Sequence, residues 1–182
     1  MSKAIGMAEF KTISAGMTAA DTMVKTAAVD IIEAETVCPG KYIVIVTGEL
    51  SAVNASVQAA ITQHPLHLID NFVLGNPAEE IFPAIYGASR VSEVKALGII
   101  ETYDAAAIIV AADQAAKTAE VSLIEIRLAR GMCGKSYLLI TGEVAAVEAA
   151  IANAQKSVEP RGMFLDSSVI ARPDKKFIDH IM

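Results

Sequence analysis

The sequence has no tryptophan, few aromatic residues and little basic charge. Its 182 residues are 53% hydrophobic but only 5% aromatic, so Ala, Val and Ile supply most of the apolar character. Such a composition favours tight packing and extensive contacts between copies, and we expect an oligomer. The formal net charge is −6, and no run of basic residues is longer than Lys175-Lys176. A nucleic-acid partner is therefore not expected.

Signals for export, membrane insertion and catalysis are also missing. The start of the chain has no apolar segment of signal-peptide length, and the uncharged stretch from Leu50 to Ile69 is interrupted by polar residues and Pro65. We therefore expect a cytoplasmic protein without a membrane span. No glycine-rich nucleotide motif occurs, and no set of nucleophile, base and orienting residue can be found. An enzyme is not expected.

Only two cysteines are present, Cys38 and Cys133. In a reducing compartment such residues are more often free or metal-bound than disulfide-paired. Cys38 precedes Pro39 and Gly40, which predict a turn between two strands with the thiol at its tip. One thiol per chain makes a poor metal site, because iron–sulfur clusters and structural zinc need three or four ligands. A ring of identical chains would supply the missing ligands at its axis.

The chain contains two copies of one pattern. Ile5-Gly6-Met7-Ala8-Glu9 returns 92 residues later as Leu97-Gly98-Ile99-Ile100-Glu101, and Gly40-Lys41 returns 94 residues later as Gly134-Lys135. Pro77 and Pro173 are 96 residues apart, so the second copy has longer loops. We predict a tandem duplication with domains at residues 1–90 and 91–182 and a join near residues 87–95.

Each copy is predicted to run strand, helix, strand, strand, helix, strand. In the first copy the expected strands are 4–11, 29–37, 42–47 and 68–74, and the run 42–47 should be buried on both faces. The expected helices are 16–29, with Met17, Ala20, Val24 and Ala28 at helical spacing, and a second one capped by Ser51 and ending near Gln63. This order is typical of an α+β, ferredoxin-like fold, here repeated twice.

The motifs resemble those of a known family, the shell proteins of bacterial microcompartments, in its tandem-domain trimeric class. The resemblance rests on Ile5-Gly6-Met7-Ala8-Glu9, on Ala20-Asp21 through Lys25-Thr26-Ala27, on the Cys38-Pro39-Gly40-Lys41 turn, on Thr47-Gly48-Glu49 and on Asn76-Pro77 with Arg172-Pro173. It covers nearly the whole chain. Within the class, the Cys-Pro-Gly turn is most similar to that of the T-type proteins of propanediol-utilisation shells.

The resemblance implies a structural tile in a microcompartment shell. Three chains would form a flat pseudo-hexamer whose loops face the central axis, and three copies of Cys38 would bind one [4Fe–4S] cluster, which aerobic purification can destroy. Such a cluster would carry electrons across the shell or supply clusters to enclosed enzymes. The axial loops would comprise Thr36, Val37, Pro39 and Gly40 from the first copy and Arg130, Gly131, Met132, Cys133 and Gly134 from the second.

Further roles follow from the same resemblance. Lys25 and Lys117 would lie at the tile edge, beside Asn76 and Arg172 of a neighbouring tile. The expected partners are two further copies, other shell proteins and a lumenal or cytosolic redox enzyme. Cys133 is either a bystander or part of another ligand set, and Arg130 would add positive charge near an anionic cluster.

Two other functions stay open at this point. In one, the trimer has no cluster and its axial loops line a pore that conducts small metabolites. In the other, the chain is a ferredoxin-like regulatory module that binds a small ligand between subunits and does not form sheets.

Overall fold

The computed structural model describes residues 4–181, which divide into two compact units. The first contains residues 4–77 together with two short segments of the second repeat, Asp104–Ala106 and Ala129–Gly134. The second contains Ala78–Tyr103, Ala107–Leu128 and residues 135–181. No helix in the described part of the chain is both long and apolar enough to cross a membrane.

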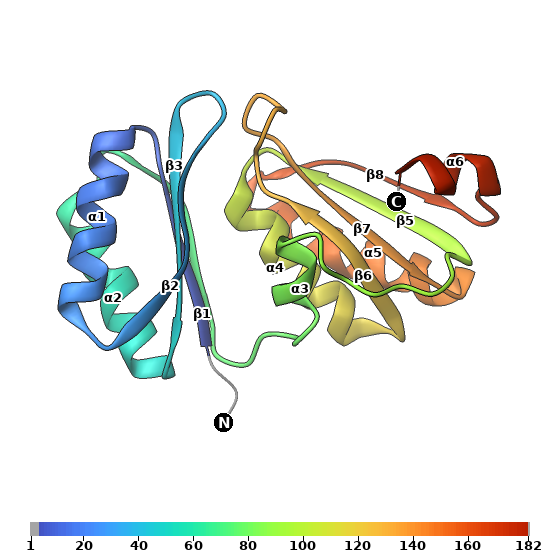
Figure 1. Ribbon diagram of the computed structural model, residues 1–182, viewed down its shortest axis with the longest axis horizontal. Coiled ribbons are helices and arrows are strands. Elements are labelled where there is room, and N and C mark those ends of the chain that lie inside the picture. Colours follow the sequence, from blue (N-terminus) through green and yellow to red (C-terminus); the bar gives the residue numbers. More distant parts are fainter. Residues whose placement is uncertain (1–3, 182) are drawn as a thin grey trace. The chain divides into compact units, whose positions relative to one another are not determined.

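The first unit has the predicted ferredoxin-like order. Its elements are β1 (Ala4–Phe10), α1 (Ile13–Thr26), β2 (Val29–Val37), β3 (Lys41–Gly48), α2 (Leu50–Gln63) and β4 (Leu68–Leu74). The strands form one antiparallel sheet in the order β2-β3-β1-β4, and α1 and α2 lie against one face of it (Figure 1). The fold class predicted from the order of elements is confirmed.

The core of the first unit lies between this sheet and its two helices. Central strand β3 is buried on both faces, as predicted, and Ile43, Val44, Ile45 and Val46 have no exposed surface. Gly6 on β1 lets α2 approach closely, because a Cβ at this position would lie 2.5 Å from Val53 Cγ1. The small residue therefore sets the spacing between the sheet and α2.

The second unit repeats the arrangement. Its sheet has the order β6-β7-β5-β8, which corresponds strand for strand to β2-β3-β1-β4. The elements are α3 (Ile81–Ile85), β5 (Ala96–Thr102), α4 (Ala105–Thr118), β6 (Val121–Arg127), β7 (Ser136–Gly142), α5 (Val144–Val158), the 3-10 turn η1 (Glu159–Arg161), β8 (Phe164–Ile170) and α6 (Lys175–Ile181). The internal duplication is thus a duplication of structure.

Several details differ from the prediction. Helix α1 begins at Ile13 instead of Gly16 and ends at Thr26. Ser51 does not cap α2, because the helix begins one residue earlier and Glu49 occupies the N-cap position without a side-chain hydrogen bond. The short helices α3 and α6 were not predicted from the sequence.

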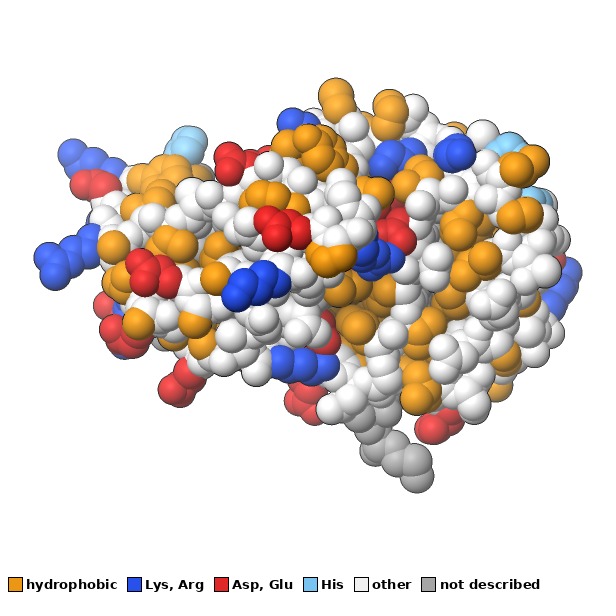
Figure 2. All heavy atoms as spheres, turned by 180° about the vertical axis from the view of Figure 1, so that it is seen from behind, with side chains coloured by type: hydrophobic (Ala, Val, Ile, Leu, Met, Phe, Trp, Pro, Cys, Tyr) orange, Lys and Arg blue, Asp and Glu red, His pale blue; other side chains and the backbone are white. Residues whose placement is uncertain are grey.

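The apolar stripe that predicted α1 overlaps the buried face of the helix only at Ala20. The buried residues are Ala15, Gly16, Ala19, Ala20 and Met23. Met17 and Val24 are instead 54% and 41% exposed. Hydrophobic side chains lie among charged ones on the surface in Figure 2. The large exposed hydrophobic residues are Ile13, Met17, Val24, Ile31, Leu50, Leu66, Tyr86, Tyr103, Val144 and Phe177.

Candidate functional site

The β2–β3 turn presents Cys38 as the sequence predicts. Strand β2 ends at Val37 and β3 begins at Lys41, and the Cys38–Pro39 peptide bond is cis. Gly40 has φ = +102°, a conformation that favours glycine, and its N–H donates to Val37 O at 2.9 Å. We call Thr36–Gly40 the first loop.

The Cys38 thiol is free, partly exposed and held by backbone groups of the segment Ala129–Gly134. Gly131 N donates a hydrogen bond to Cys38 Sγ over 3.3 Å, and Cys38 N donates to Ala129 O over 3.0 Å. Both segments belong to the first unit. The sulfur therefore has a defined position and a donor that stabilises negative charge on it.

The segment Arg130–Gly134, which we call the second loop, has an unusual backbone. Gly131, Cys133 and Gly134 all have positive φ, with +53° at Cys133. Cys133 is exposed and free. A Cβ on Gly134 would lie 3.0 Å from Cys38 O, so the absence of a side chain permits the two loops to approach.

Arg130, which the sequence suggested as a source of positive charge, is paired with two carboxylates. Its guanidinium forms ion pairs with both Glu33 and Glu35 on β2. Burial, followed by the nearby Glu35 charge, raises the pKa of the Glu33 carboxyl, while Arg130 opposes this rise. The guanidinium therefore ties the second loop to β2, and two carboxylates balance its charge.

A hollow of about 560 Å³ lies beside the thiol. Its lining consists of Ile13, Thr36, Val37, Cys38, Pro39, Gly40, Arg130 and Gly131. Among residues 4–181 of a single chain, no group of three or more His, Cys, Asp or Glu side chains could hold a metal ion. A metal bound at Cys38 would need ligands from further copies.

A buried carboxylate binds Ala105, the first residue of α4, within the first unit. Glu9 Oε1 accepts from Lys41 Nζ at 2.7 Å, and Glu9 Oε2 accepts from Ala105 N at 2.9 Å. The Glu9 side chain is fully buried, and the Lys41 side chain is 14% exposed. Sequence reasoning identified Glu9 and Glu101 as repeated positions but not their role. The parallel repetition of Lys41 as Lys135 was the signal that could have revealed it.

The residues predicted at the tile edge lie on the surface. Lys25 pairs with Asp21 at 2.6 Å, and both side chains are more than half exposed. Lys117 pairs with Asp113 at 2.6 Å, but the Asp113 side chain is only 2% exposed and also accepts from Ala78 N. Asn76 and Arg172 are exposed.

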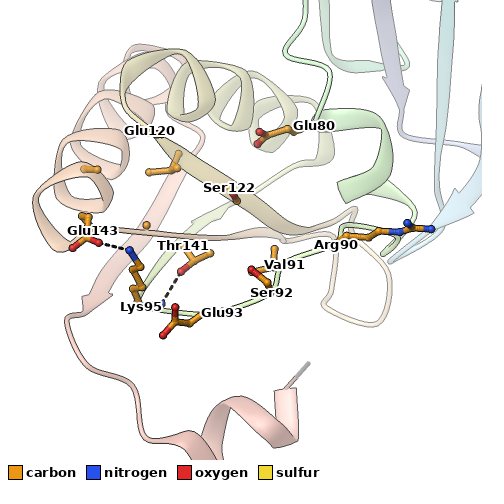
Figure 3. Close-up of a pocket in the computed structure, with 13 residues that line it drawn as sticks. Glu80, Arg90, Val91, Ser92, Glu93, Lys95, Glu120, Ser122, Thr141 and Glu143 are labelled. Carbon is orange, nitrogen blue, oxygen red and sulfur yellow. Dashed lines mark hydrogen bonds and ion pairs between the residues drawn. The ribbon is translucent and has the colours of Figure 1, made fainter.

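The second unit has a polar pocket that the sequence did not predict (Figure 3). It has a volume of about 650 Å³. Lys95 Nζ donates to Glu143, which raises the pKa of the lysine, and Lys95 N donates to Thr141 Oγ1. Glu80, Glu93 and Glu120 also line it. With Arg90 and Lys95 as its basic residues, the pocket has more carboxylates than cations in its lining.

Residues 4–77 and 96–173 each match the BMC domain family. The chain belongs to this family of bacterial microcompartment shell proteins. It is 38% identical over 173 residues to the bacterial microcompartment shell protein PduT of Citrobacter freundii, covering 95% of this chain and 94% of that protein. The carboxysome shell protein CcmK2 of Synechocystis is 46% identical over 61 residues, or 34% of this chain and 59% of that protein.

Solved structures give the same result. A microcompartment protein from Desulfitobacterium hafniense is 44% identical and superposes with a TM-score of 0.89 over 98% of this chain and 99% of that one. A fused permuted hexameric shell protein of the RMM microcompartment is 18% identical, with a TM-score of 0.66 over 87% of this chain and 82% of that one, and supports the fold alone.

The BMC-domain chain is therefore a structural shell component of the PduT type, and its family is not catalytic. Its place is the microcompartment shell, where shell proteins assemble with one another. The predicted family, repeat and location are confirmed. The predicted domain boundary after residue 90 stays a prediction, since the family match leaves residues 78–95 unassigned.

Proposed function

We propose that three copies of this shell protein form a ring and hold one [4Fe–4S] cluster on its axis through Cys38 of each copy. The observation that carries the proposal is the Cys38 thiol itself. It is free, partly exposed at the tip of the first loop and oriented by the Gly131 N–H. One donor per chain becomes three by rotation, which is enough for a cluster with one iron left for a non-protein ligand.

The internal repeat supports a head-to-tail ring. In the first unit, Glu9 binds both Lys41 and the N–H of Ala105, the first residue of α4. Glu101 and Lys135 are the repeat equivalents of Glu9 and Lys41, and Ile13, the first residue of α1, is the equivalent of Ala105. Ile13 of one copy would therefore bind Glu101 of the next. Repeating this contact around an axis closes the ring.

The exposed side of α1 supports the same arrangement. Ala105 and Ile109 of α4 are fully buried, whereas their equivalents on α1, Ile13 and Met17, are 39% and 54% exposed. An apolar helix face that is buried in one repeat and exposed in the other is expected where a second copy covers it. In the proposed ring, the exposed apolar residues of α1 would contact the neighbouring copy.

The groups around Cys38 fit a thiolate-bound cluster. The Gly131 N–H donates to the sulfur, and hydrogen bonds to ligand sulfurs are one of the means by which a protein sets a cluster's reduction potential. Gly134, without a side chain, lets the second loop approach the Cys38 carbonyl oxygen. When bound, the cluster would supply one-electron transfer, and the chain's part is to position the ligand and limit solvent access.

Iron content tests the proposal. Protein purified without oxygen, or reconstituted with iron and sulfide, is expected to carry about four iron and four sulfide ions per trimer, with an EPR signal after reduction. Cys38→Ser should abolish binding while the trimer persists. Cys133→Ser is the matched control and should keep full iron content.

Two outcomes would overturn the proposal. A trimer that stays free of iron after reconstitution would favour a pore that conducts metabolites. Loss of iron in Cys133→Ser with retention in Cys38→Ser would assign the ligand to the second loop.

We also propose that Lys25, Lys117, Asn76 and Arg172 form the contacts between neighbouring tiles. All four are exposed, and Lys25 and Lys117 lie at equivalent positions in the last turns of α1 and α4. The partners at this edge are further copies and other shell proteins, and the electrons would pass to a redox enzyme on one side of the shell.

A further inference from the structure

Helices α3 and α6 are repeat equivalents in different surroundings. The 96-residue offset that relates Pro77 to Pro173 also relates Ile81 to Phe177 and Ile85 to Ile181. Ile81 is fully buried and Ile85 is 7% exposed, whereas α6 has no buried residue. One helix is therefore packed firmly and the other is not.

The segment that leads into α3 is held by two specific contacts within the second unit. Ala78 N donates to Asp113 Oδ1 at 2.9 Å, and Leu123 N on β6 donates to Glu80 Oε2 at 3.2 Å. Asp113 and Leu123 are almost completely buried there. The end of the first repeat is thus attached to α4 and β6.

The equivalent attachment points for α6 are exposed. Asp21 on α1 corresponds to Asp113, and Ile31 on β2 corresponds to Leu123. The Asp21 side chain is 59% exposed against 2% for Asp113, and Ile31 is 45% exposed against 2% for Leu123. A surface that receives a helix in one repeat is vacant in the other.

In the single chain, α6 lies on its own sheet instead. Ile178 and Ile181 pack against the cluster of Leu97, Ile124 and Leu139. Phe177 and Ile181 line a groove of about 340 Å³ with Leu97, Ile99, Glu101, Tyr137 and Leu139. Their equivalents in the first unit, Ile5, Met7, Glu9, Ile43 and Ile45, are fully buried, and this face includes the contact to the first turn of α4.

We propose that α6 leaves its own sheet when the ring forms and docks across α1 and β2 of the next copy, as α3 docks across α4 and β6. The inference rests on the proposed ring. In that ring, α1 of one copy lies beside Glu101 of its neighbour, in the place that the neighbour's own α6 partly occupies in the single chain. Only α6 can then be displaced, because its side chains are loosely packed.

Charge favours the new position. Strand β2 carries Asp30, Glu33 and Glu35 and no basic residue, and Arg130 pairs with both Glu33 and Glu35. The two carboxylates share this single positive charge, whereas α6 begins with Lys175 and Lys176. Lys176 stands where Glu80 stands in the first repeat. The bond that Glu80 accepts from the Leu123 N–H would therefore be replaced by attraction between a lysine and the acidic strand. The surface formed by α1 and β2 therefore suits the lysine-bearing α6 of a second copy better than a helix that carries a glutamate at this position, as α3 is preceded by Glu80.

Cross-linking in the full chain tests the exchange. In a Cys38→Ser, Cys133→Ser background, Ile31→Cys with Lys176→Cys is treated with a short bismaleimide, and Ile99→Cys with Phe177→Cys serves as the comparison pair. We expect the first pair to give covalent dimers and trimers on a denaturing gel. The comparison pair should cross-link within a single chain, and only in samples dilute enough for ultracentrifugation to detect monomers.

The outcomes separate the two proposals. The protein could form trimers in which only the comparison pair cross-links, within single chains. This result would overturn the proposed docking of α6 on the next copy and leave the ring proposal intact. Absence of trimers at any concentration would overturn the ring and the exchange together.

A second variant does not depend on cross-linking geometry. Ile31→Asp should weaken trimer formation roughly tenfold, since it places a charge in a docking surface, and Leu66→Asp, at another exposed apolar residue, should not. Equal trimer affinity of the two variants would also overturn the exchange.

Discussion

The buried pair Glu9–Lys41 gives a quantitative test of the first unit. The Glu9 side chain is fully buried, its two oxygens bind Lys41 Nζ and Ala105 N, and the Lys41 side chain is 14% exposed. Removing one partner of a buried ion pair leaves the other without compensation and costs about 3–5 kcal/mol. Glu9→Gln and Lys41→Met should therefore each lower the free energy of unfolding by about 3 kcal/mol or more.

The double variant should be less damaged than the sum of the single variants. With both charges removed, no uncompensated ion remains, and we expect a coupling energy of about 2 kcal/mol. For a chain of this size, 3 kcal/mol corresponds to a fall in melting temperature of roughly 6–12 °C. Glu148→Gln, an exposed carboxylate on α5, is the control and should change stability by less than about 0.5 kcal/mol.

Urea denaturation of the four proteins and the control, followed by circular dichroism, measures these differences. Additive effects of the two single variants, with a coupling below about 0.5 kcal/mol, would refute the reasoning. A cost for Glu9→Gln no larger than that of Glu148→Gln would refute it as well. Either result would mean that solvent reaches this pair more freely than its burial indicates.

Three further predictions concern packing, titration and assembly. Gly6→Ala should lower the free energy of unfolding by about 1–3 kcal/mol in denaturant titrations, because the new Cβ would lie 2.5 Å from Val53 Cγ1. Burial, with a hydrogen bond to Glu125, raises the pKa of Tyr137 to about 12. The folded state therefore keeps this proton longer than the unfolded state, so stability should fall as pH rises from about 10 to 12, and Tyr137→Phe should remove the late step in ultraviolet absorbance. Lys25→Ala should keep the proposed trimer but prevent extended sheets in electron micrographs, and normal sheets would contradict the proposed edge contact.

The order and placement of strands could be predicted because local signals agree with the fold. Strands β2 and β4 have the predicted bounds, Val29–Val37 and Leu68–Leu74, since turn residues flank both. The uninterrupted apolar run of β3 correctly indicated burial on both faces. The Cys38-Pro39-Gly40 turn was predictable for the same reason, because proline and glycine act locally.

Features that depend on distant partners could not be predicted. Helix α3 contains Pro83 and only five residues, and its stability comes from buried Ile81 instead of helix propensity. The pairing of Arg130 with Glu33 and Glu35 joins residues almost a hundred positions apart. The apolar stripe of α1 indicated a helix. It could not tell which apolar residues pack against the sheet of the same chain and which would contact another copy.

The duplication has a chemical consequence at the two loops. In a ring built from identical single domains, every loop is the same, so all thiols would have the same surroundings and bind metal alike. Linking two domains in one chain removes that restriction. Cys38 receives a hydrogen bond from Gly131, while Cys133 stands exposed on a left-handed backbone. One assembly can thus hold two chemically distinct sets of sulfur atoms, and selection can adjust the reactivity of one without altering the other.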